Sequence, residues 1–163
     1  LQTRIAKMEA GLCDALLLAY AGAHRMGYNN MIRHELSLDE FTPAVGQGSV
    51  AIESSVNLDS MLKSKIIKAC HHEATGYRLL AERAYLRVLE GGCSIPVFAL
   101  AENKADKLLL KGGIVSLDGS KRIIHQVSGP SFQAEELGKE LAKLVLESGG
   151  DEILKQIKSD LKK

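Results

Sequence analysis

The segment "IPVFALAENKADKLLLKGGIVSLDGSKRIIHQVSG", residues 95–129, decides the fold of this chain. It contains three apolar runs, "IPVFALAE", "KLLLKGGIVSL" and "KRIIHQVSG", each with the length and composition of a β-strand. The last two runs are separated by "DGS", a strong signal for a hairpin turn. The segment therefore predicts a small three-stranded antiparallel sheet.

A helix is predicted before this sheet, in "HHEATGYRLLAERAYLRVLEGG", residues 71–92. Apolar side chains recur there at the i, i+3, i+4, i+7 spacing of one helix face; they are Tyr77, Leu80, Ala81, Ala84 and Val88. Gly91 and Gly92 follow this pattern and predict the end of the helix, because glycine readily adopts the left-handed conformation that closes a helix.

Two more helices are predicted after the sheet. In "SGPSFQAEELGKELAKLVLES" Ser131 is the expected N-cap, and the buried stripe is expected to consist of Leu137, Leu141, Leu144 and Val145. Gly149 and Gly150 break this helix, and Asp151 is expected to cap a final one that contains Ile153, Leu154, Ile157 and Leu161. The part of the chain from about residue 70 is thus predicted to be an α+β domain with its helices on one face of the sheet.

The N-terminal part has a different pattern. A short helix is predicted up to Gly11, with Ile5 and Met8 on one face, and "AGAHRMG" predicts another that ends at Gly27. Between them "DALLLAY", Asp14–Tyr20, is apolar throughout, which is typical of a strand buried in a parallel sheet. "GSVAIE", residues 48–53, is one more short candidate strand. Because a buried strand needs neighbours on both sides, we expect this part to be the end of an α/β domain, and the chain to be a fragment.

Composition excludes some classes of function. Of 163 residues, 21 are Lys or Arg and 20 are Asp or Glu, giving a net charge of +1. That balance argues against a general nucleic-acid binder, and no apolar run approaches the roughly 20 residues of a membrane-spanning helix. The three cysteines show no metal-ligand spacing with the five histidines, so we expect no metal site and a reducing, cytoplasmic location with free thiols.

Cys93 lies in "LEGGCSIPVF", at the corner between the predicted helix and the first strand. A turn beside rigid elements can present a functional group, and two glycines leave room for a bulky group. A helix C-terminus disfavours a thiolate, although Arg83 and Arg87 could offset this effect. From these residues alone, a small buried hydrophobe is the commoner role of such a cysteine, and a functional thiol is the alternative.

Several motifs resemble those of the porphobilinogen deaminase (hydroxymethylbilane synthase) family. "AERAYLRVLEGGCSIPV" is similar to the family's segment around its cofactor-bearing cysteine. "TRIAKMEAGLCDALLLAYAGAHRMG" and "TPAVGQGSVAIE" resemble two further family segments, as do "HHEAT", "LDGS" and "GPSFQAEELGKELAKLVLESGGDEIL". The resemblance covers essentially the whole chain in order.

The resemblance implies an activity and a cofactor. The family polymerises porphobilinogen, with release of ammonia, into linear hydroxymethylbilane on the route to haem. A dipyrromethane cofactor is attached through a thioether to a cysteine, and the matching residue is Cys93. This residue would anchor the growing chain and would not act as a catalytic base.

The resemblance also implies binding residues. Arg4 and Arg25 match arginines that line the family's cleft, where guanidinium groups suit the carboxylates of substrate and cofactor. The commoner role of a single arginine is a solvated charge on a helix face. Gly46, Gln47 and Gly48 match a crossover beside the cofactor, where backbone amides can hold an acidic group. The simpler explanation is an ordinary turn.

The family's three-domain fold implies a layout for this chain. Residues 1–43 would be the later half of an α/β domain like those of periplasmic binding proteins. Residues 44–69 would return to the first domain, and residues 70–163 would be the α+β domain that contains the cofactor cysteine. The family's catalytic aspartate, in a K-D motif, and its S-x-R-R arginines have no counterpart here. We therefore expect the chain alone to be inactive and without its cofactor, its partner being the missing N-terminal half of a monomeric enzyme.

Two rival interpretations remain open at the level of sequence. One is a non-catalytic module that binds small anions through Arg4, Arg25 and the "VGQG" turn and leaves Cys93 unmodified. The other is a structural α+β domain in which Cys93 only fills space. The chemical state of the Cys93 thiol distinguishes all three.

Overall fold

The computed structural model describes residues 1–90, 92 and 94–161 of the chain. These residues form two compact units, Leu1–Phe41 and the chain from Thr42 onward. The predictions made for Gly91 and Cys93 lie outside the described residues.

The first unit contains the two predicted helices. Helix α1 spans Gln2–Glu9 and buries Ile5, and helix α2 spans Tyr20–Arg25 and buries Ala23. A short 3-10 helix, η1 (Asn29–Met31), follows α2. The amide of Gly27 donates to the carbonyl of His24 at the end of α2, as the sequence predicts.

The strand predicted at Asp14–Tyr20 is wrong for the described residues, because residues 14–19 form no ladder and Tyr20 already belongs to α2. Leu12 and Leu17 are 70% and 72% exposed. The candidate strand at residues 48–53 is likewise unpaired, with Val50 91% exposed. A strand is defined by hydrogen bonds to a neighbour, and the described residues offer these two segments none.

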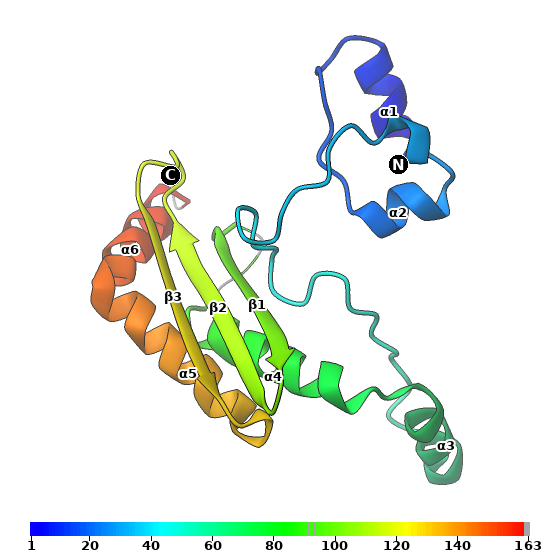
Figure 1. Ribbon diagram of the computed structural model, residues 1–163, viewed down its shortest axis with the longest axis vertical. Helices are drawn as coiled ribbons and strands as arrows, with labels where there is room; N and C mark the ends of the chain where they lie inside the picture. The colour runs from blue at the N-terminus through cyan, green and yellow to red at the C-terminus, as the bar shows by residue number, and fades with distance from the viewer. Residues whose placement is uncertain (91, 93, 162–163) are drawn as a thin grey trace. The chain divides into compact units, whose positions relative to one another are not determined.

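The second unit is built on the predicted sheet. Strands β1 (Val97–Lys104), β2 (Lys107–Val115) and β3 (Arg122–Gly129) pair antiparallel in the order β1-β2-β3 (Figure 1). Alternate residues of β1 are buried, as expected for a sheet with one covered face. The three-stranded antiparallel sheet predicted from residues 95–129 is thus confirmed.

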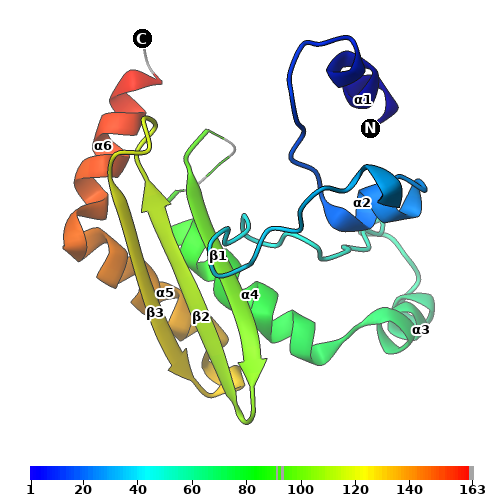
Figure 2. The ribbon, with the colours of Figure 1, turned by 45° about the horizontal axis from the view of Figure 1, so that its top comes forward.

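Helices α4 (Glu73–Val88) and α5 (Ala134–Val145) cover one face of the sheet, and α6 (Asp151–Asp160) continues beyond α5 (Figures 1 and 2). The core between these layers includes Tyr85, Leu89, Leu110, Ile114, Leu141, Val145 and Ile157. The fully buried hydroxyl of Tyr85 donates to the carbonyl oxygen of Gly113 in β2 at 2.8 Å. Burial raises the pKa of this phenol well above its usual range.

The structure corrects the predicted face and end of α4. Ala81 and Ala84 are buried as expected, but Leu80 and Val88 are 41% and 43% exposed. Tyr85 and Leu89 are buried in their place, so the buried face is rotated from the predicted one. The left-handed residue that follows α4 among the described residues is Glu90, with φ of 50°. Because Leu89 is anchored in the core, the chain turns directly after it.

Other boundaries also differ from the prediction. Ser131 does not cap α5; it begins a 3-10 helix, η2 (Ser131–Gln133), which places the N-cap of α5 at Gln133. A π-helical turn, η3 (Leu146–Gly150), joins α5 to α6, with Gly149 at φ 98°. Helix α3 (Ser60–Cys70) was not predicted at all, although Asp59 caps it by accepting a hydrogen bond from the Leu62 amide at 2.9 Å.

The turn between β2 and β3 predicts a pH effect. Hydrogen bonds from the hydroxyls of Ser116 and Ser120, together with the Ser120 amide, lower the pKa of Asp118 from 3.8 to about 2. Because the folded state lowers this pKa, the ionised carboxylate stabilises the fold above about pH 4, and this stabilisation is lost as the pH falls towards 2. Asp118→Asn should therefore flatten the fall in urea unfolding midpoint between pH 4 and pH 2.

The matched control is Asp106→Asn in the turn between β1 and β2, since the Asp106 carboxylate accepts no hydrogen bond from the described residues. This control should keep the wild-type pH dependence. An Asp118→Asn profile that coincides with wild type over the same pH range would contradict the assignment.

Candidate functional site

The "VGQG" turn has a fixed conformation within the second unit. Gly46 and Gly48 have φ of 75° and 85°, in the left-handed region that residues other than glycine rarely adopt. The Gln47 amide donates to the carbonyl of Ala44 at 3.1 Å, and the Ser49 amide donates to the carbonyl of Gly46 at 3.2 Å. Val45, just before the turn, packs against the core. The turn is therefore built for a defined shape and is docked on the domain.

A buried carboxylate holds this turn. Glu82 in α4 is only 4% exposed, and its Oε2 accepts a hydrogen bond from the Gly46 amide at 2.7 Å. Its other oxygen, Oε1, accepts from the Ala101 amide of β1 at 2.8 Å. One side chain thus joins a helix, an edge strand and the turn.

Arg78, one helical turn before Glu82, contacts the same strand residue. Its Nε donates to the carbonyl oxygen of Ala101. Arg78 and Glu82 therefore satisfy both backbone groups of Ala101 on the edge of β1 that faces away from β2. Unpaired groups on an edge strand invite association with other chains, so this pair of side chains protects the edge and fixes α4 along it.

These contacts narrow the predicted role of the turn. The amides of Gly46 and Gln47 are already donated to Glu82 and Ala44. The Gly48 amide donates to no acceptor among the described residues. Of the three backbone donors predicted to hold an acidic group, only that of Gly48 remains available to a ligand.

Glu90 follows α4 and precedes the predicted corner of Cys93 in the sequence, and it forms an ion pair with another helix. The carboxylate of Glu90 pairs with Lys158 of α6. The hydrogen bond and charge of Lys158 lower the pKa of Glu90 below its ordinary value. The thiol itself is outside the described residues, so its place in the site stays a prediction.

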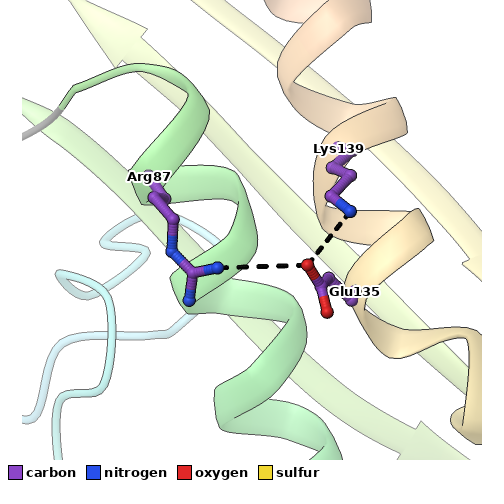
Figure 3. Close-up of polar contacts among 3 residues, drawn as sticks. All are labelled: Arg87, Glu135 and Lys139. Carbon is purple, nitrogen blue, oxygen red and sulfur yellow. Dashed lines mark ion pairs between the residues drawn. The ribbon is translucent and has the colours of Figure 1, made fainter.

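From the sequence, Arg87 is a positive charge that could offset the C-terminus of α4, and the structure places its guanidinium beside Glu135 of α5. Figure 3 shows it directed towards Glu135 of α5, with Nη1 and Oε1 separated by 3.9 Å, while Lys139 contacts the same oxygen at 3.0 Å. The pKa of Glu135 is lowered by the hydrogen bond and charge of Lys139, with a smaller effect of Arg87. This network links α4 to α5, and solvent exposure makes its contribution to stability small.

Arg4 and Arg25 lie in the first unit. Arg4 is in α1, Arg25 is the last residue of α2, and both are exposed. Neither guanidinium forms an ion pair within the described ranges. Both groups are thus available to carboxylates of a ligand, and the geometry that would bring them to the turn stays a prediction.

The described part of the chain contains no group of three or more His, Cys, Asp or Glu side chains that could hold a metal ion. None of its helices combines the length and apolar content needed to cross a membrane.

Glu82 is the residue that the sequence pattern missed. A glutamate in an amphipathic helix is normally expected on the solvent face. The available signal was its place between Ala81 and Ala84–Tyr85, on the face that the structure buries. A charge on such a face must be hydrogen-bonded, so this position could have identified Glu82 as a residue with hydrogen-bond partners inside the domain.

Comparison with known proteins assigns both parts of the chain to one family. Residues 1–63 match the model described as "porphobilinogen deaminase, dipyromethane cofactor binding domain", and residues 77–147 match that of the porphobilinogen deaminase C-terminal domain. Arg4, Arg25 and Gly46–Gly48 fall within the first match, and Cys93 falls within the second.

Curated relatives agree with these matches. The chain is 54% identical to the porphobilinogen deaminase of Cytophaga hutchinsonii, over 100% of this chain and 52% of the relative. It is 50% identical to that of Desulfosudis oleivorans, over 96% of this chain and 51% of the relative. For Carboxydothermus hydrogenoformans the identity is 42%, over 98% of this chain and 51% of the relative. The chain thus spans about half the length of the curated relatives it matches, and it belongs to the porphobilinogen deaminase family.

Proposed function

We propose that this chain is the C-terminal part of a porphobilinogen deaminase. That enzyme joins porphobilinogen units into linear hydroxymethylbilane, with release of ammonia, in the synthesis of haem and related tetrapyrroles. The supporting observation is that relatives of this name align with nearly all of the chain but with only about half of their own length. The partner we propose is the remaining half of the same enzyme.

Exposed apolar side chains support a missing partner. Val50, Ile52 and Val56 are 91%, 61% and 98% exposed, and α3 exposes Met61 and Ile67 at 66% and 52%. Val50, Ile52 and Ile67 line one common pocket, and an exposed apolar patch of this kind marks a surface that is covered in the working protein. We propose that residues 44–69 pack against that other half.

The same proposal covers the first unit. Residues 1–43 would be the later half of an α/β domain like those of periplasmic binding proteins. The exposure of Leu17 in the present structure fits an element without its partners. Residues 70–163 form the third domain of this scheme.

The proposed cofactor is a dipyrromethane joined to Cys93 through a thioether, and it supplies the end from which the product chain grows. Its carboxylates need cationic or amide donors. The guanidinium groups of Arg4 and Arg25 and the amide of Gly48, which have no partner among the described residues, have this chemistry. Gly46 and Gln47 shape the turn. The chain alone holds no cofactor in this proposal, since attachment requires the assembled cleft.

The direct test supplies the missing half. The part of the Cytophaga hutchinsonii relative that this chain does not span is placed before residue 1, and consumption of porphobilinogen is measured. We expect the fusion to release ammonia and form hydroxymethylbilane, and the 163-residue chain alone to show no turnover, because the catalytic aspartate of the family has no counterpart in it.

Two results would contradict this proposal. One is turnover by the isolated chain, purified from a host that lacks its own deaminase. The other is a folded but inactive fusion under conditions in which the intact relative is active. The intact relative, expressed in parallel, is the control for the assay and for the supply of cofactor.

The proposed location is the cytoplasm, and the proposed state of the whole enzyme is a monomer. Cys13 and Cys70 are both exposed and unbonded, which fits a reducing compartment. The molar mass of the fusion, measured by light scattering during gel filtration, tests whether the whole enzyme is a monomer.

A further inference from the structure

We infer that Glu82 is a positioning residue that fixes the Gly46–Gly48 turn to the two elements flanking the corner of Cys93. This inference rests on the proposed function for its meaning, because it concerns how the turn is placed for a group attached at that corner. Its structural content, the contact between Glu82 and the turn, can be tested separately.

The connectivity around Glu82 supports this role. Helix α4 contains Glu82 and ends at Val88, just before the corner, while β1 begins at Val97, just after it. The Glu82 carboxylate bonds to β1 through the Ala101 amide and to the turn through the Gly46 amide. A single rigid group therefore relates the turn to both sides of the corner.

The chemistry of the contact requires a carboxylate. Both Glu82 oxygens accept from backbone N–H groups, at 2.7 and 2.8 Å. An ionised carboxylate offers acceptors only, whereas the amide of glutamine offers one acceptor oxygen and one N–H₂ donor group. Glutamine has the same size and can keep only one of the two bonds, because its N–H₂ would face another N–H.

The site itself decides which bond a glutamine would keep. Ala101 is 0% exposed, so an unsatisfied amide there has no access to water. Gly46 is only partly buried, and its turn can move outward to reach solvent. In Glu82→Gln the side-chain oxygen should therefore remain on Ala101, and the turn should be released.

Release of the turn would change what a ligand meets. With Gly46 held by Glu82 and Gln47 held by Ala44, the free Gly48 amide has one fixed direction relative to α4. Without the Glu82 bond, the direction of the Gly48 amide is no longer fixed relative to α4, the helix that precedes Cys93 in the sequence. The expected consequence is poorer binding of an acidic group at the corner, with the domain still folded.

The test is amide hydrogen exchange on the 163-residue chain, resolved at Gly46 and at core amides of α5. In wild type the Gly46 amide should be protected although it lies in a turn. In Glu82→Gln its exchange should accelerate about tenfold or more relative to α5, because a hydrogen bond to a charged acceptor is lost. The matched control is Tyr85→Phe, which removes a buried hydrogen bond that the same helix makes to Gly113 of β2 and leaves the Glu82 carboxylate unchanged.

The outcomes separate cleanly. Faster exchange at Gly46 in Glu82→Gln, with the Gly46-to-α5 ratio unchanged in Tyr85→Phe, supports the inference. An unchanged ratio in Glu82→Gln overturns it. If Glu82→Gln does not fold, the exchange rate of the Gly46 amide in the wild-type chain is the test. An unprotected Gly46 amide there would show that the contact with Glu82 is absent and would equally overturn the inference.

A second measurement addresses positioning in the fused enzyme described above. The fraction of folded molecules that contain dipyrromethane, read from intact mass, should fall severalfold in Glu82→Gln and stay at the wild-type level in Tyr85→Phe. Equal loading of the two variants would overturn the positioning role. Absence of the cofactor from the wild-type fusion would count against the proposed function instead, and the exchange experiment would then decide the inference alone.

Discussion

Replacing Cys93 by serine is expected to abolish both the covalent dipyrromethane and the turnover of porphobilinogen by the fused enzyme. Thioether formation needs a sulfur nucleophile, and a serine hydroxyl is a weak nucleophile at neutral pH unless a base activates it. The wild-type fusion, made in a cell that synthesises haem, should show the added mass of a dipyrromethane. In Cys93→Ser the mass should be that of the polypeptide alone.

The chain provides its own controls for this experiment. Cys13 and Cys70 are exposed free thiols, so they are open to any unspecific modification. Cys13→Ser and Cys70→Ser should keep the added mass and the activity. A wild-type fusion without added mass would exclude the anchor role and would favour an anion-binding module with an unmodified cysteine. Retention of the mass in Cys93→Ser would assign the attachment to another residue.

The sheet and its helices could be predicted because their signals are local. The apolar runs of β1, β2 and β3 have strand length, and the turn after β2 contains Gly119 at φ 73°. The turn between β1 and β2 lacks such a signal, because Ala105 takes the left-handed conformation at φ 51° without being glycine. Strand pairing compensates for that strain, since Lys104 and Lys107 are paired on either side of it.

Features that depend on distant partners could not be predicted in the same way. Residues 14–20 have the composition of a buried strand, but composition supplies no neighbour, and the structure leaves Leu17 exposed. Glu82 has the partners that residues 14–20 lack, but they are distant in the sequence. Its carboxylate oxygens accept from the amides of Gly46, 36 residues before it, and Ala101, 19 residues after it. Only the folded domain brings these amides together, so the main anchor of the candidate site was not visible as a motif.

Replacing Gly138 by alanine is expected to destabilise the C-terminal domain by about 2 kcal/mol or more, at the high end for a single methyl group. A Cβ at Gly138 of α5 would lie 2.3 Å from the carbonyl oxygen of Ala81, 2.6 Å from the Cβ of Ala84 and 2.9 Å from the Tyr85 nitrogen. Two of these atoms belong to the backbone of α4, so rotation of a side chain cannot relieve the clash and the helices must separate. Alanine gains about 1 kcal/mol of helix propensity over glycine, which offsets only part of this cost.

The matched control for Gly138 is Gly76→Ala in α4, where the new methyl group would meet only the ring of His71, at 3.1 Å. That ring belongs to an exposed side chain that can move, so this variant should be neutral or slightly stabilised. Thermal unfolding followed by circular dichroism should show the midpoint of Gly138→Ala lowered by roughly 10 °C. Equal midpoints for the two variants would mean that α4 and α5 tolerate a wider separation. The turn of α4 that bears Glu82 would then lack the rigid support on which its hold of Gly46 depends.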